Sequence, residues 1–187
     1  MKINKKTILI IFIFAAIAQL AVPISMIYKK EFVSKGGEIY KFQTRPIDPY
    51  DPFRGKYITL NFDRKPIEVE NTEEWENGEM AFFTIKKDSL GYAEVFGISK
   101  SKPKNGDFLK MKVYIYHRGT IGKTISYTLP FDRFYMNEDE ALNAEIEYKK
   151  ANRNSNKENA YAIVKILDGE HVLEDVIIGG VSAKDLK

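Results

Sequence analysis

The first hydrophobic pattern in the chain is an unbroken apolar run, TILIIFIFAAIAQLAVPISMIY, from Thr7 to Tyr28. A helix needs about 20 mostly apolar residues to cross the hydrocarbon core of a bilayer. No charged side chain lies between Thr7 and Met26, and three lysines precede the run: Lys2, Lys5 and Lys6. The pattern predicts a membrane anchor over residues 1–30, followed by one domain over residues 31–187.

A removable signal peptide is the alternative interpretation of this segment, because Ala16-Ile17-Ala18 resembles a small-residue cleavage site. Hydrophobicity continues to Ile27, so cleavage there would leave an apolar N-terminus in water. We therefore expect the anchor to be retained. A short basic tail ahead of the first helix usually stays in the cytoplasm, which places the domain outside, although three lysines after the anchor partly balance the tail: Lys29, Lys30 and Lys35.

Beyond the anchor, apolar and polar residues alternate with the period of two that is typical of half-buried strands. The clearest case is residues 109–116, and residues 56–62 alternate in the same way, with Ile58, Leu60 and Phe62 on one face. The same reasoning predicts further strands at residues 38–44, 80–86, 92–98, 124–129, 133–136, 161–167 and 171–178. Hairpin turns are predicted at residues 88–91 and at Asp168-Gly169.

One helix is predicted from Asn137 to about Ala151, because Asn137 and Glu140 have the spacing of a capping box. Leu142 and Ile146, four residues apart, are expected to form its apolar stripe. The predicted fold is therefore mainly β (α+β): an N-terminal transmembrane helix followed by an antiparallel β barrel or sandwich with one short helix.

Composition and charge narrow the function classes. The 187 residues carry a net charge of +3 without a basic stripe, so nucleic acid is a poor partner. No cysteine is present, which excludes disulfides and thiolate metal sites. The two histidines, His117 and His171, lie in separate strand-like segments, so we assign no metal and no cofactor.

The proline-rich loop that includes Asp48, Asp51 and Arg54 is the first candidate binding site. Two carboxylates beside a guanidinium can bind a cation, a peptide amine or a polar headgroup. The structural alternative is a turn in which Asp precedes Pro and Arg54 pairs with an aspartate. Gly55 and Tyr57, which follow directly, are grouped with this candidate site.

Arg133, Tyr135 and Glu138, at the start of the predicted helix, form the second candidate site. A guanidinium near a positive helix end can attract an anionic ligand. The simpler interpretation is a helix cap, because Glu138, Asp139 and Glu140 already occupy that electrostatic position.

The segment RPIDPYDPFRGKYITLNF resembles the signature region of the GDYXXLXY family, and RFYMNEDEALNAE resembles the second block of that family. Gly55, Tyr57 and Leu60 agree with the family pattern, whereas Lys56 replaces an expected Asp and Phe62 an expected Tyr. The resemblance implies a small bacterial membrane-anchored protein of unknown function, with a multi-spanning membrane protein as partner. It supplies no catalytic residue.

The resulting hypothesis is a noncatalytic binding or accessory subunit at the membrane. The alternative is a membrane-bound hydrolase, because Ser25, RGKYITLNF, Lys86 and RFYMNED loosely resemble the box order of signal peptidases with a Ser nucleophile and a Lys base. A lysine must be desolvated to act as a base near neutral pH, and Lys86 lies beside Lys87 and Asp88.

Overall fold

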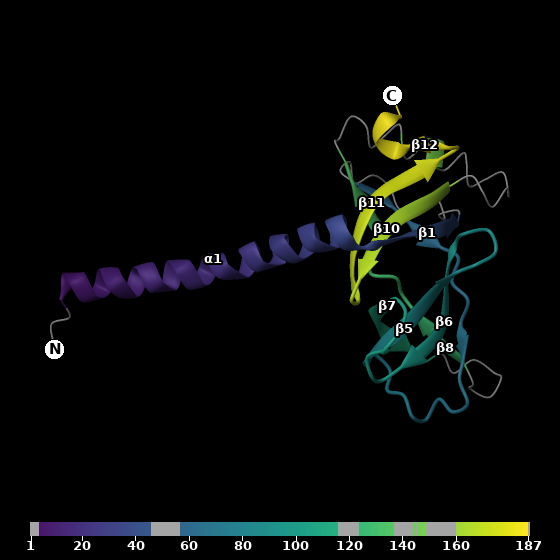
Figure 1. Cartoon of the computed structure of the whole chain (residues 1–187), viewed down its shortest axis with the longest axis horizontal. Helices are drawn as coiled ribbons and strands as arrows, with labels where there is room; N and C mark the ends of the chain where they lie inside the picture. Colours follow the sequence, from purple (N-terminus) through teal and green to yellow (C-terminus); the bar gives the residue numbers. More distant parts are fainter. Residues whose placement is uncertain are drawn as a thin grey trace.

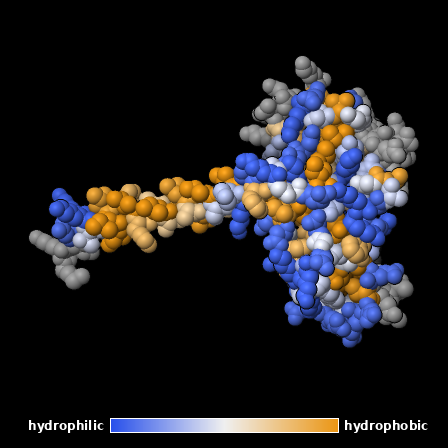
Figure 2. All heavy atoms as spheres, viewed as in Figure 1, coloured by the Kyte–Doolittle hydropathy of each residue, from blue (hydrophilic) through white to orange (hydrophobic). Residues whose placement is uncertain are grey.

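The structure is a computed structural model. The model describes residues 4–45, 57–115, 124–136, 144, 146–148 and 160–186. One long helix, α1 (Lys5–Gly36), projects away from a β-rich domain (Figure 1). Asn4 caps α1 by accepting a hydrogen bond from the backbone N–H of Lys6. By length and composition α1 can cross a membrane, and its large apolar side chains from Ile8 to Phe32 are exposed (Figure 2).

The β domain is built from short strands and a final 3₁₀ turn. These are β1 (Glu38–Arg45), β2 (Tyr57–Thr59), β3 (Asn61–Phe62), β4 (Ile67–Glu68), β5 (Met80–Lys87), β6 (Ala93–Ser99), β7 (Phe108–Tyr114), β8 (Thr124–Tyr127), β9 (Arg133–Tyr135), β10 (Ala160–Leu167), β11 (Glu170–Ile178), β12 (Val181–Ser182) and η1 (Ala183–Asp185).

Two five-stranded antiparallel sheets and one two-stranded ribbon make up the domain. The sheet orders are β12-β11-β10-β1-β3 and β4-β8-β7-β5-β6, and β2 pairs with β9. Isolated bridges between Lys41 and Tyr92 and between Leu109 and Gly169 join the two large sheets. The first sheet lies on one side of the point where α1 enters and β5–β8 on the other (Figure 1). The predicted mainly β fold with a barrel-like sheet is confirmed.

The alternating side chains of both sheets meet in one apolar core. Three aromatic rings of this core contact one another edge to face, with ring centroids separated by 4.9 Å for Phe42–Phe131 and 5.5 Å for Phe62–Phe131. This geometry is the favoured one for aromatic pairs because it matches ring edges to ring faces. The core thereby joins β1 and β3 to the segment that leads into β9.

Most predicted strands are present, and both predicted hairpins form between paired strands. Asp168 and Gly169 both have positive φ, as a tight hairpin turn requires. The predicted strand at residues 56–62 is divided: β2 pairs with β9, β3 pairs with β1, and the Leu60 N–H donates to the Asp132 carbonyl at 2.8 Å. Ile58, Leu60 and Phe62 are all buried, as the alternation predicted.

Of the predicted helix, the structure describes Ala144 and residues 146–148, which are helical. The predicted apolar stripe is wrong at Ile146, which is 43% exposed. Ala144 and Tyr148, also four residues apart, are buried instead, and the Tyr148 hydroxyl donates to the Arg45 carbonyl. The ring of Tyr148 therefore orients the helix. Leu142 lies outside the described residues.

The last turns of α1 pack directly on β10 and β11. Val33 is 3% exposed, and the Ser34 hydroxyl donates to Glu174 Oε1 at 2.6 Å. The Lys30 ammonium donates to the His171 carbonyl at 2.6 Å, and the Lys165 ammonium donates to the Ser34 carbonyl. The helix thus enters the domain through a packed junction.

Candidate functional site

The ribbon of β2 and β9 brings together three of the predicted site residues: Tyr57, Arg133 and Tyr135. Tyr57 lies opposite Tyr135 in the antiparallel register, with ring centroids 5.3 Å apart. The Arg133 guanidinium carbon lies 5.1 Å from the centroid of the Tyr57 ring, within range of a cation–π interaction. We call these three side chains the tyrosine–arginine cluster.

The alternation of the two strands explains why the cluster faces outward. Ile58 and Phe134 lie opposite each other on the inner face and are buried, which anchors the ribbon in the core. The residues on either side of them therefore point away from the core. Tyr135 is 65% exposed, an unusually open position for a tyrosine beside a packed core.

The side chains around Arg133 favour its charged form. A side-chain hydrogen bond with Tyr135, followed by the nearby Tyr57 and Asp132, raises the pKa of Arg133 above its ordinary value. Arginine is charged at all physiological pH values in any case, so the cluster presents a permanent positive charge flanked by two phenols. Such a surface can donate hydrogen bonds, stack on a flat group and pair with an anion.

The other predicted site residues are not described: Asp48, Asp51, Arg54, Gly55 and Glu138 lie outside the described residues. The sequence predicted Tyr57 and Arg133 as parts of two different sites. The structure places them in one, because β2 and β9 pair across more than seventy intervening residues. Nothing local in either segment signals this pairing.

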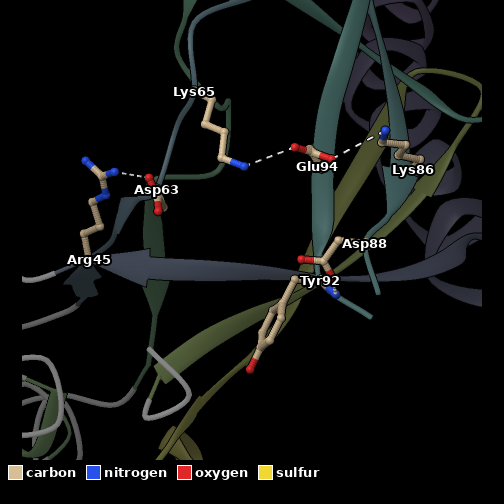
Figure 3. A network of polar contacts seen from close by, with 7 residues as sticks. All are labelled: Arg45, Asp63, Lys65, Lys86, Asp88, Tyr92 and Glu94. Carbon is tan, nitrogen blue, oxygen red and sulfur yellow. Dashed lines mark hydrogen bonds and ion pairs between the residues drawn. The ribbon is translucent and has the colours of Figure 1, made fainter. Parts of the chain in front are cut away.

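A second polar group, which the sequence did not reveal, lies alongside β1, from Arg45 at its end to Tyr92 opposite Lys41 (Figure 3). Glu94 lies between two lysines, with its carboxylate oxygens 3.2 Å from Lys65 Nζ and 3.6 Å from Lys86 Nζ. Arg45 pairs with Asp63, and the Asp88 carboxylate accepts the Tyr92 N–H at 2.8 Å. These contacts link neighbouring strand ends and pair most of the charges, as in a structural clamp.

A shallow cavity of about 180 Å³ lies beside this clamp. It is lined by Arg64, Lys65, Pro66, Ser126, Tyr127 and Thr128. Arg64 donates to the Tyr127 carbonyl at 3.1 Å and to the Thr128 hydroxyl at 3.3 Å, so its guanidinium already has protein partners.

The two residues of the hydrolase alternative have separate environments. Ser25 lies on α1 and its hydroxyl donates to the Val22 carbonyl at 2.7 Å. Lys86 lies on β5, pairs with Glu94, and its ammonium lies 5.1 Å from the centroid of the Phe96 ring. Lys86 is half exposed rather than desolvated, so the arrangement lacks the feature that a Ser–Lys pair requires.

His171 is a strongly perturbed titratable group beside the junction of α1 with β11. Burial, followed by the positive charge of Lys30, lowers the pKa of His171 to about 4. Its ring packs against Phe131 with centroids 5.4 Å apart. Within the described part of the chain, no group of three or more His, Cys, Asp or Glu side chains is placed to hold a metal ion.

A helix able to span a membrane and an antiparallel domain that displays the tyrosine–arginine cluster fit a membrane-anchored β protein. The family model described as GDYXXLXY protein matches residues 19–176, so the chain belongs to the GDYXXLXY family. The match includes both β2 and β9. No curated protein and no solved structure matches the chain.

Proposed function

We propose that this protein is a noncatalytic accessory subunit, retained in the membrane by α1, that binds a membrane-protein partner through the tyrosine–arginine cluster. The domain is placed on the extracytoplasmic side in this proposal, because the lysines before the apolar run favour a cytoplasmic N-terminus. The observation that carries the proposal is that half-buried Tyr57 packs with exposed Arg133 and Tyr135 on an anchored ribbon.

Tyrosine and arginine are enriched among the residues that contribute most to protein–protein binding. The cluster has a large apolar contact area, polar tips and a preorganised guanidinium, because Arg133 is already held against the Tyr57 ring. The buried Ile58–Phe134 pair fixes the ribbon beneath it. Little side-chain conformational freedom is therefore lost when a partner binds.

A membrane location supports the same proposal. The last turns of α1 pack on β10 and β11, so the domain is held close to the end of the apolar segment. A partner embedded in the same bilayer therefore meets the domain at a high effective concentration. Modest contact energy at the cluster is then sufficient for binding.

Site-specific photo-cross-linking in intact membranes tests the proposal. A photoreactive phenylalanine analogue replaces Tyr135, and the control places it at Lys112, an exposed β7 residue on a different sheet. We expect an integral membrane protein to be cross-linked from position 135 and not from position 112. Adding Arg133→Ala should reduce the cross-linked yield about tenfold, the effect of losing one central arginine contact.

Two results would contradict the proposal. Equal yields from positions 135 and 112 would show that the cluster has no special contact with a partner. A yield from position 135 that Arg133→Ala leaves unchanged would show that the guanidinium does not contribute. Circular dichroism of each variant in detergent checks that the β domain remains folded.

A further inference from the structure

The apolar part of α1 contains one side-chain amide, that of Gln19. The hydroxyl of Ser25 donates to the Val22 carbonyl and is thereby satisfied within the helix. Among the residues that the structure describes, Gln19 has no comparable side-chain hydrogen bond. In water, solvent would satisfy the Gln19 amide, but α1 has the length and composition of a membrane-spanning helix.

A second unsatisfied group belongs to the same residue. Pro23 lies inside α1 and has no backbone N–H. The helical carbonyl that this N–H would have paired with is four residues earlier, which is the carbonyl of Gln19. Residue 19 therefore offers an amide with donors and an acceptor, and beside it a free backbone acceptor.

Water cannot satisfy these groups in a bilayer. At 1.5 Å of rise per residue, Gln19 lies about 18 Å from Thr7 and about 14 Å from Tyr28, near the middle of the apolar segment. A glutamine side chain is too short to reach either interface from that depth. Polar groups in the hydrocarbon core need a protein partner, and glutamine commonly finds one across a helix–helix interface.

The helix surface around Gln19 allows such an approach. Ala15, one turn earlier, and Ala16 are small and lie on the same face, whereas Ile17 projects from the opposite face. Small residues let two helix backbones come close enough for a side-chain amide to reach its neighbour. At the depth of Gln19, α1 therefore has both small residues that let a second helix approach closely and polar groups without a partner in the helix.

We propose that α1 self-associates in the membrane, with the amide of Gln19 in each copy hydrogen-bonded to Gln19 of a second copy of this chain. A second copy inserted in the same orientation places an identical amide at the same depth, and an amide is both donor and acceptor. The contact is isologous, as in most homodimers. This inference is independent of the tyrosine–arginine cluster.

Energy transfer between labelled full-length chains in lipid vesicles measures the association at a series of protein-to-lipid ratios. We expect Gln19→Leu to lower the apparent association constant about five- to tenfold, as for other single interhelical polar contacts. Gln19→Asn retains an amide and should restore most of the association. Leu20→Ala, which leaves Gln19 intact, is the control and should behave as the unmodified chain does.

Cysteine cross-linking identifies the face, because the chain has no cysteine of its own. Ala15→Cys, on the Gln19 face, should give a disulfide-linked dimer under mild oxidation, and Ile17→Cys should give at least fivefold less. Equal cross-linking at both positions, or identical energy transfer for Gln19→Leu and the unmodified chain, would overturn the proposal. So would a cross-linked product from Ala15→Cys in native membranes that contains a different protein in place of the second copy.

Discussion

At the scale of single residues, the structure gives one histidine a stability role that its sequence context does not suggest. His171 is the second residue of β11, where its carbonyl accepts a hydrogen bond from the Lys30 ammonium and its ring contacts Phe131. Both burial and the nearby lysine disfavour a protonated ring, so the neutral form is bound into the junction. The junction between helix and sheet is therefore sensitive to acid.

This sensitivity gives a pH prediction. The pKa of His171 is lowered from 6.5 to about 4 in the folded protein, so between these values the unfolded chain binds the proton and the folded protein does not. We therefore expect His171 to leave stability nearly unchanged above pH 6.5 and to lower it by about 2–3 kcal/mol as the pH decreases from 6.5 to 4. Thermal unfolding in detergent at pH 7 and pH 4.5 measures this loss of stability.

The comparison with His171→Gln isolates this histidine from the carboxylates, which also titrate at low pH. The variant should lose clearly less stability between pH 7 and pH 4.5 than the unmodified protein. An identical pH dependence in both proteins would show that His171 is as easily protonated in the folded state as in the unfolded chain.

Gly37 is the second informative residue, because it connects α1 to β1 at a point of close backbone contact. A Cβ atom there would lie 2.6 Å from the Val33 carbonyl oxygen and 3.1 Å from the Ile166 nitrogen. Both contacts are with backbone, which cannot rotate away. We expect Gly37→Ala to lower the free energy of unfolding by about 1–3 kcal/mol, measured by urea unfolding in mild detergent.

The neighbouring glycine supplies a matched control. A Cβ at Gly36 would meet only the Leu167 Cδ2 atom, at the ordinary contact distance of 3.7 Å. Gly36→Ala should therefore be neutral or slightly stabilising, since alanine favours the helix. A similar loss for both substitutions would contradict the close-contact explanation for Gly37.

At the scale of elements, hydrophobic alternation predicted the strands well, because every second residue of a half-buried strand faces the core and is apolar. It did not predict β4 and β12, since two residues carry no period. It also missed the break at Leu60, where the chain changes its pairing partner without losing its alternation. The local sequence indicates which face of a strand is buried. It does not indicate which other strand pairs with it.

The same limit applies to the candidate site. Tyr57 and Arg133 were each recognisable as residues of interest, but their contact depends on strand pairing between distant segments. The structure describes three of the eight predicted site residues, and those three converge. The residues that follow β9 predicted a helix correctly at 144 and 146–148, while its buried face followed Tyr148 rather than Ile146.

At the scale of the whole molecule, α1 belongs to two environments. Its first part is apolar and exposed, while its last turns are part of the domain's packing through Val33 and Ser34. A fragment that begins at Lys29 should fold as a soluble domain, because it retains these contacts. A fragment that begins at Gly37 lacks them and should melt at least 5 °C lower, since burial of Val33 and several hydrogen bonds are lost.

Thermal denaturation followed by circular dichroism compares the two fragments at the same concentration. Equal melting temperatures would show that the end of α1 only rests on the sheet. In that case the junction contacts would contribute nothing measurable to the stability of the domain.

The direct passage from α1 into β1 at Gly37 also limits where the domain can travel. Because no flexible linker separates α1 from β1, the domain cannot move independently of the helix. It changes direction only when the whole helix rotates about its own axis. Whatever binds the domain must therefore reach it near the C-terminal end of α1, because the packed junction makes the helix and the domain turn together.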